Sequence, residues 1–196
     1  MDDDLIKRWN IFVDRSQEYF ATYWTIPFSF TPKEIYDLSY KNDNEIDDYF
    51  LGYYQIRSKN YNDSIHYIKN NLTIYRNLFI QIEQNLSDGN YLICIPSEIL
   101  ILEGCISDYT NSRSTHIVDL IKEKMNSEQN EVKKIMLSSM LNFVTKLYSC
   151  FDFDRNKQLM YINRHWIEHG RDSGAWELID AIRLLQAIET LIFISK

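Results

Sequence analysis

Hydrophobic side chains recur at steps of three and four residues along most of the chain, which is the spacing of one face of an α-helix. Polar residues or glycines separate these periodic segments, as they do at helix ends. The pattern contains neither a β-hairpin signal nor a repeat of ~20–50 residues, so we expect an all-α bundle. It predicts helices over residues 4–24, 64–86, 91–108, 114–125, 131–150, 154–169 and 176–195.

Prolines mark several features of the predicted helices. Pro27 and Pro32 are expected to end the first helix, because proline cannot continue the hydrogen-bond ladder. The sequence Thr31-Pro32-Lys33-Glu34 has a capping threonine, a proline at the first helical position and a following acid, which predicts the start of a short helix. Pro96 falls within the first two turns of the apolar central helix over 91–108.

The composition of the chain changes near residue 62. The polar cluster Asn60-Tyr61-Asn62-Asp63 is the best candidate boundary between two parts. We therefore predict an acidic, aromatic-rich helical segment over 1–62 and a helical bundle over 63–196. The 196 residues are enough to bury a sizeable core.

The formal net charge is −7, from 28 acidic and 21 basic side chains. Most of the acidic excess lies in residues 1–50. This charge argues against a protein that grips nucleic acid through a broad cationic surface, and no DNA partner is expected. It leaves room for an enzyme that meets RNA at one small site.

The cysteines and the hydropathy pattern indicate the compartment. Cys94, Cys105 and Cys150 are scattered, odd in number and form no C-x-x-C pair, so we expect reduced thiols rather than disulfides or a cysteine zinc site. The acidic start Met1-Asp2-Asp3-Asp4 is unlike a signal peptide, and no apolar run approaches ~18 residues. The sequence therefore predicts a cytoplasmic protein that does not contact a membrane.

Two of the four histidines lie in the segment Asn163-Arg164-His165-Trp166-Ile167-Glu168-His169-Gly170-Arg171. A histidine followed by glycine is common at helix ends, where the helix dipole favours a cation, so one interpretation is structural. The functional interpretation rests on the density of Arg, His and Glu side chains in this segment. Leu159, Ile162 and Trp166 occupy the other side of the same predicted helix, so they can be buried while the polar cluster stays accessible.

One functional interpretation is a zinc site, because the segment from His165 to His169 matches H-x-x-E-H with Glu168 as general base. The pattern is short, and a catalytic zinc needs a third protein ligand. Only Glu177 and Glu189 remain downstream, and metalloproteases of this class are far longer chains. We expect no metal site and, since nucleotide-binding and serine-hydrolase motifs are lacking, no cofactor.

The spacing Arg164-x4-His169 resembles the R-x(4–6)-H motif of the HEPN superfamily, small all-helical bundles that often act as metal-independent endoribonucleases. His165 supplies the polar residue that typically follows the arginine. Ile95-Pro96-Ser97, the pair Glu103-Gly104 and Gly174 resemble a group of uncharacterised bacterial proteins, and the resemblance covers roughly residues 64–196. The H-x-Y form found with nucleotidyltransferase partners is absent, because Gly170-Arg171 follows the histidine.

The resemblance implies a HEPN-like bundle with an N-terminal helical extension, acting as a bacterial toxin or antiphage ribonuclease, a hydrolase of RNA. It also implies a homodimer in which two motifs form one site, and a protein antitoxin or regulator as a further partner. The alternative from another class is a non-catalytic helical module that binds a nucleotide or a protein.

The residue types in the motif suit RNA cleavage by the 2′-hydroxyl. Imidazole titrates near neutrality and can act as base or acid, and guanidinium binds phosphate oxygens bidentately. We therefore assign His169 as general acid or base and Arg164 as phosphate clamp. The accessory residues are His165 as phosphate contact or proton carrier, Glu168 or Glu103 to orient the arginine or a histidine, and also Asn163 and the local cation Arg171. For Glu168, a plain surface ion pair with the arginine is the stronger interpretation.

Helix geometry sets a condition on this assignment. Residues five apart on an ideal helix point about 140° away from each other. Arg164 and His169 therefore do not share a face of one straight helix. They can converge through a distorted helix end or across a two-fold dimer.

Overall fold

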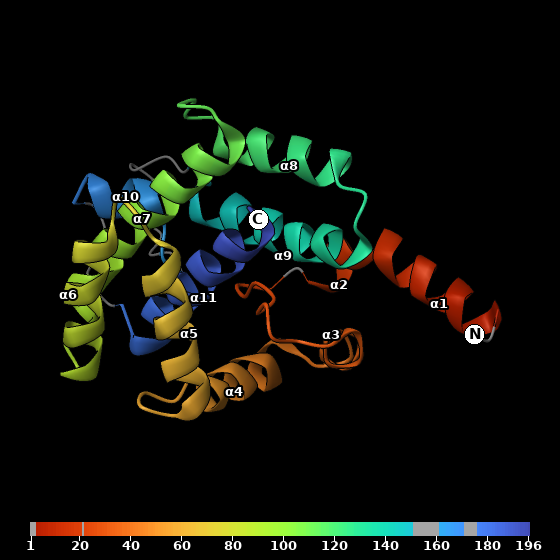
Figure 1. Ribbon diagram of the computed structural model, residues 1–196, viewed down its shortest axis with the longest axis horizontal. Coiled ribbons are helices and arrows are strands. Elements are labelled where there is room, and N and C mark those ends of the chain that lie inside the picture. The colour runs from red at the N-terminus through yellow and green to blue at the C-terminus, as the bar shows by residue number, and fades with distance from the viewer. Residues whose placement is uncertain (1–2, 21, 151–160, 171–175) are drawn as a thin grey trace.

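All regular elements in residues 3–20, 22–150, 161–170 and 176–196, which the computed structural model describes, are α-helices (Figure 1). The predicted all-α fold is therefore confirmed. In chain order the helices are α1 Asp3–Asp14, α2 Ser16–Tyr19, α3 Pro32–Leu38, α4 Asp43–Tyr53, α5 Lys59–Asn71, α6 Arg76–Ser87, α7 Tyr91–Thr110, α8 Ile117–Ser127, α9 Glu131–Leu147, α10 Arg164–Glu168 and α11 Leu178–Ile194.

Helix α11 lies at the centre of the bundle, and nearly every side chain along it is buried. It packs most extensively against α7 and also contacts α5 and α9 (Figure 1). Helix α6 pairs with α7, and α8 pairs with α9. A helix that is apolar on most sides needs such enclosure, because it has no polar face to turn toward water. The short helix α10 contacts α7, which places the predicted motif beside the central pair.

The predicted boundaries hold where the hydrophobic pattern ends at a polar cap. Helices α7, α8, α9 and α11 begin and end within a few residues of their predicted bounds. The predicted cap at Thr31 is also confirmed, since its Oγ1 accepts a hydrogen bond from the backbone N–H of Glu34. The Glu34 carboxylate accepts in return from the backbone N–H of Thr31 at 2.7 Å. Pro96 lies in the second turn of α7, as predicted.

The predicted helix over residues 4–24 is wrong in its second half. Helix α1 ends at Asp14, α2 covers four residues, and the chain is not helical at residues 22–24. The buried hydroxyl of Ser16 donates to the backbone carbonyl of Val13 at 2.8 Å and lies 2.9 Å from Ser138 Oγ of α9. A serine that bonds to a nearby carbonyl offers the backbone an alternative to the helix ladder. The interruption between α1 and α2 thus coincides with the contact of Ser16 with α9.

The predicted single helix over residues 64–86 is also wrong, because a turn at residues 72–75 divides it into α5 and α6. The four residues of the turn keep the three- and four-residue spacing of apolar positions, so the pattern alone does not reveal the break. At the turn, the ring of Tyr75 lies directly over Gly104 of α7. A Cβ atom at Gly104 would be 2.3 Å from that ring, so only glycine allows this approach.

Alanine at Gly104 gains helix propensity but forces the far end of the Tyr75 ring to move, so we expect Gly104→Ala to be about 1–3 kcal/mol less stable than the same change at an open helical glycine. Gly52 in α4 is the matched control, since a Cβ there meets nothing within 4 Å. Gly52→Ala should be neutral or stabilising by up to about 1 kcal/mol through helix propensity. Urea unfolding of both variants measures the difference, and equal stability of the two would contradict the packing.

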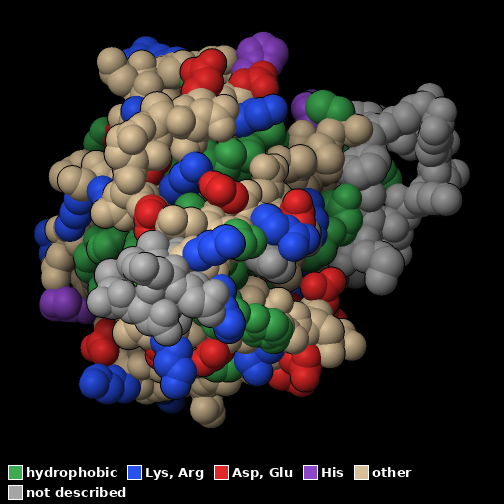
Figure 2. Space-filling view, turned by 90° about the vertical axis from the view of Figure 1, so that its right-hand side faces the viewer, with side chains coloured by type: hydrophobic (Ala, Val, Ile, Leu, Met, Phe, Trp, Pro, Cys, Tyr) green, Lys and Arg blue, Asp and Glu red, His purple; other side chains and the backbone are tan. Residues whose placement is uncertain are grey.

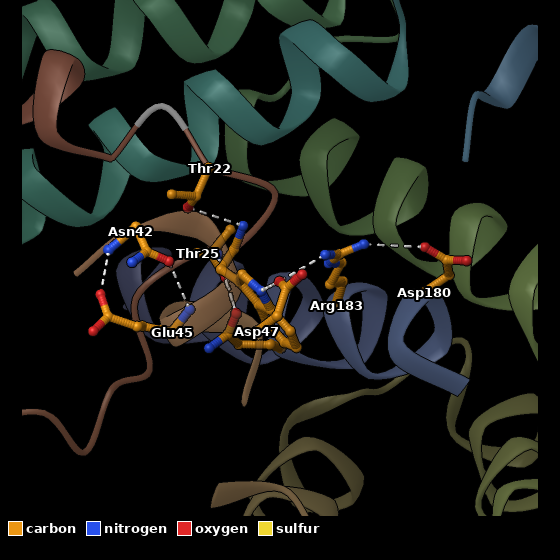
Figure 3. Close-up of polar contacts among 9 residues, drawn as sticks. Thr22, Thr25, Asn42, Glu45, Asp47, Asp180 and Arg183 are labelled. Carbon is orange, nitrogen blue, oxygen red and sulfur yellow. Dashed lines mark hydrogen bonds and ion pairs between the residues drawn. The ribbon is translucent and has the colours of Figure 1, made fainter. Parts of the chain in front are cut away.

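The N-terminal segment contributes buried side chains to the same hydrophobic core as the bundle. Trp24 stacks on Phe50 with ring centroids 4.7 Å apart, and both side chains are buried. Asp47 of α4 accepts hydrogen bonds from Trp24 Nε1 at 2.6 Å and from Arg183 of α11 at 2.7 Å (Figure 3). The compositional division near residue 62 falls inside α5, which begins at Lys59. A continuous core therefore joins the acidic segment to the central helix.

Candidate functional site

The predicted motif begins at α10, a helix of five residues whose start is fixed by Asn163. The prediction of a continuous helix over 154–169 is wrong at residues 161–163, which are not helical, and its part over 154–160 lies outside the described residues. Asn163 has an extended backbone and a fully buried side chain. Its Oδ1 accepts from the backbone N–H of Trp166, and its Nδ2 donates to the carbonyl of Ser149 at 2.9 Å. Asn163 therefore anchors the motif to the end of α9.

Trp166 and Ile162 are buried, as the amphipathic pattern predicts. They turn the opposite side of α10 toward solvent. Leu159, Arg171 and Gly174, which the sequence also placed near the motif, lie outside the described residues. The described part of the site therefore consists of α10, its C-terminal cap and the adjoining turn of α7.

Arg164 is held by two carboxylates. Its Nε donates to Glu103 Oε1 of α7 at 2.8 Å, and its Nη1 lies 2.7 Å from Glu168 Oε2 on the next turn of α10. About a quarter of the arginine side chain is exposed (26%), so the guanidinium lies at the surface with its direction fixed. A phosphate that binds here would meet a cation already flanked by two negative charges.

Tyr148, which directly follows α9, lies beneath this ion-pair cluster and was not identified from the sequence. Burial raises the pKa of its hydroxyl well above the ordinary value, and the negative charge of Glu103 raises it further. A neutral, buried phenol therefore lies close to Glu103. A lone tyrosine at a helix end gives no signal in the sequence that it will approach a residue of another helix.

His165 and His169 form a second pair on the neighbouring side of α10. Their rings are stacked with centroids 5.7 Å apart and planes inclined by 12°. His169 is exposed and His165 partly so. Gly170 follows with a positive φ of 61°, the left-handed conformation that glycine favours at a helix end. The structural interpretation of His169-Gly170 as a helix cap is therefore confirmed, and the cap leaves the imidazole at the surface.

The two pairs show where Arg164 and His169 lie on α10 within one copy of the chain. Arg164 pairs with Glu168 and His165 with His169, each four residues apart, so two parallel stripes run side by side along α10. His169 at the C-cap keeps a near-helical backbone, with φ −90° and ψ 4°. The helix end is thus not distorted in a way that turns His169 toward the side of Arg164.

The zinc interpretation gains no third ligand from Glu189. Its carboxylate is buried and accepts hydrogen bonds from the hydroxyls of Tyr54 and Ser64. In the part of the chain that the structure describes, no three His, Cys, Asp or Glu side chains come close enough to hold a metal ion.

A pocket of about 370 Å³ lies at the turn between α5 and α6. None of the predicted site residues lines it, so the motif lies on the surface outside this pocket. Its walls are formed by Asn71, Leu72, Thr73, Ile74, Tyr75, Cys105, Asp108, Tyr109, Ile192, Ser195 and Lys196.

Charges on the described surface are mixed. On the face shown in Figure 2, Lys and Arg side chains alternate with Asp and Glu, and the described residues form no broad basic patch there. This agrees with the acidic net charge. Among the described residues, no helix is both long and apolar enough to cross a membrane.

The fold and site define an all-α protein with an Arg/Glu cluster and a histidine pair at one short surface helix. Comparison with profiles of known families, with curated proteins and with solved structures finds no significant match to this chain.

Proposed function

We propose that the protein is a metal-independent endoribonuclease of the bacterial toxin or antiphage type, which cleaves RNA through attack of the 2′-hydroxyl on the adjacent phosphate. The observation that carries the proposal is the stacked, solvent-accessible pair of His165 and His169 on a short helix whose neighbouring side carries the fixed cation of Arg164. The HEPN-like spacing of Arg164 and His169 supports the same reaction.

The histidine pair supplies the two proton transfers that the reaction needs. One imidazole accepts the proton of the 2′-hydroxyl, and the other donates a proton to the leaving 5′-oxygen. The bond from the 2′-oxygen to phosphorus forms as the bond from phosphorus to the 5′-oxygen breaks, which leaves a 2′,3′-cyclic phosphate. His165 is thus a full partner of His169 rather than an accessory residue.

Arg164 stabilises the charge that develops on the phosphate. A guanidinium has five N–H donors, and contacts from Nε and Nη1 to Glu103 and Glu168 leave donors for phosphate oxygens. Glu168 is 41% exposed and can swing away when RNA binds, whereas Glu103 keeps the arginine in place from α7. Glu103 therefore acts as a positioning residue.

The proposed enzyme acts in the cytoplasm as a homodimer, with a protein antitoxin or regulator as its further partner. Within one chain, Arg164 and His169 lie on different sides of α10. Two motifs that meet around a two-fold axis would let the arginine of one copy serve the histidines of the other.

A non-catalytic module that binds a nucleotide or a protein is the second candidate. The observation that favours it is the double ion pair, because two carboxylates give Arg164 a structural role without any substrate. The cap at His169-Gly170 likewise explains the second half of the motif as a helix end.

Incubation of the purified chain with single-stranded RNA in excess EDTA separates the candidates. We expect cleavage to continue, with products that carry 2′,3′-cyclic phosphate and 5′-hydroxyl ends, read by mass spectrometry. Activity that EDTA abolishes would indicate a metal enzyme and overturn the proposal. If every RNA tested stays intact at every protein concentration, the binding module is favoured.

A further inference from the structure

The pocket of about 370 Å³ at the turn between α5 and α6 has two aromatic side chains in its lining that neighbouring helices hold in place. The ring of Tyr75 lies over Gly104 of α7, where any side chain would collide with it. The ring of Tyr109 has the ammonium group of Lys124, from α8, 4.7 Å from its centroid. Both rings are therefore positioned before a ligand binds, which lowers the entropic cost of binding.

The deeper part of the lining is apolar. Leu72 at the end of α5 and Ile192 of α11 are both buried and belong to the hydrophobic core. The thiol of Cys105 lies with them, and burial together with the negative charge of Asp108 raises its pKa to about 12. The thiol is therefore neutral near pH 7 and acts as a small apolar group. This lining suits a ligand with an aliphatic or aromatic body.

Two exposed side chains of opposite charge line the same pocket, Asp108 of α7 and Lys196 just beyond α11. The ammonium group of Lys196 donates to Asn71 Oδ1 at 2.5 Å and lies 5.0 Å from the ring centroid of Tyr67, so it is held at the end of α5. In the part of the chain that the structure describes, the carboxylate of Asp108 has no ion-pair partner. The pocket thus presents an anion and a cation that do not neutralise each other.

We infer that this pocket binds a small zwitterion with an apolar body, of the chemical class of a free amino acid. The ammonium group of the ligand pairs with Asp108, its carboxylate pairs with Lys196, and its body lies on the apolar lining. Charge-assisted hydrogen bonds of this kind are stronger than neutral ones and fix the orientation of a ligand. A volume of about 370 Å³ is near the lower end for ligand pockets, which agrees with a ligand of this size.

Ligands with one sign of charge match the pocket less well. A simple amine brings its cation close to Lys196, and a simple carboxylic acid brings its anion close to Asp108. A nucleotide brings a doubly charged phosphate to the same carboxylate, in a protein whose net charge is −7. A zwitterion pairs with both groups. None of the motif residues on α10 lines the pocket, so this site is independent of the proposed ribonuclease.

Calorimetric titration of the full chain with L-phenylalanine, L-leucine and 6-aminohexanoate tests the site, because these probes differ in their apolar bodies and in the separation of their charges. At least one should bind at a single site with a Kd below about 1 mM. The amine 2-phenylethylamine and the acid 3-phenylpropionate each lack one charged group of phenylalanine. Each should bind at least about tenfold more weakly than the best zwitterion.

Asp108→Asn should weaken binding of the best zwitterion at least about tenfold, because it removes the partner of the ligand ammonium with little change in size. Asp119→Asn is the matched control, since Asp119 is exposed on α8 and does not line the pocket. Circular dichroism checks that both variants stay helical.

Three results would overturn the inference. They are the absence of saturable binding by all three zwitterions, binding that Asp108→Asn leaves unchanged, and binding of the amine, the acid or guanosine monophosphate as tight as that of the best zwitterion. RNA cleavage enters none of these measurements, so the ribonuclease proposal is tested separately.

Discussion

Replacing either His165 or His169 with alanine is expected to lower the rate of RNA cleavage by about 10²–10⁴-fold, the usual contribution of one acid or base. The two rings are stacked on one side of α10, so the loss of either leaves one of the two proton transfers without a partner. The two losses should be similar. The double variant should lose little more than either single variant, because groups that act as a unit are not additive. Initial rates on a defined RNA measure all three.

His66→Ala is the matched control for this experiment. His66 is an exposed histidine of α5 that contacts Asn70 on its own helix, far in sequence from the motif. Its replacement should leave cleavage unchanged. Unfolding curves show whether a loss at His169, next to the helix cap, reflects chemistry or folding.

The pH profile gives a readout that a structural role would not change. With one histidine as base and the other as acid, the wild-type rate should pass through a maximum as pH rises, since one ring must be neutral and the other charged. The residual activity of each single variant should lose one limb of this profile. Full activity of both single variants would refute the assignment of the pair.

The sequence predicted the ends of helices well where the hydrophobic pattern stops at a capping or turn residue. The Thr31 cap before α3 and the turn after α7 are examples, because capping and turn residues act locally. It failed at residues 72–75, where the apolar spacing continues through the turn. At that turn Tyr75 packs on Gly104 of α7, a contact between residues distant in sequence that no local pattern encodes.

At the candidate site too, the sequence predicted contacts within one helix better than contacts between helices. The i,i+4 pairing of Arg164 with Glu168 and the divergence of Arg164 from His169 both follow from helix geometry and were predicted. Glu103 was named as one of two partners for the arginine, and the structure shows that both carboxylates contact it. The approach of Tyr148 to this cluster and the burial of Asn163 depend on how α9, α7 and α10 pack, which the sequence does not specify.

The hydrophobic core contains a buried acid, Glu189, that is expected to make the stability of the protein depend on pH. Glu189 of α11 is 1% exposed and accepts hydrogen bonds from the hydroxyls of Tyr54 at 2.6 Å and of Ser64. It thereby joins α5 and the end of α4 to the central helix. Burial raises the pKa of Glu189 to about 7 from an ordinary value of 4.5, although the two hydrogen bonds act in the opposite direction.

The direction of the pH effect follows from this shift. Below pH 4.5 the carboxyl is protonated in both the folded and the unfolded chain, so its neutral form is accommodated without penalty. As pH rises toward about 7, the unfolded chain releases the proton while the folded protein retains it, and stability falls. At about 1.4 kcal/mol per pKa unit, the loss is about 3 kcal/mol once the pH exceeds the folded pKa.

Glu189→Gln should therefore stabilise the protein at about pH 8 by about 3 kcal/mol and change its stability much less at about pH 5, as measured by urea unfolding. The amide has nearly the same shape as the protonated acid, and it can accept from Tyr54 Oη and donate to Ser64 Oγ, so the core contacts remain. Glu123→Gln, an exposed position on α8, is the matched control and should follow the wild type at both pH values. A Glu189→Gln variant whose stability keeps the wild-type pH dependence would show that folding does not raise the pKa of this carboxyl.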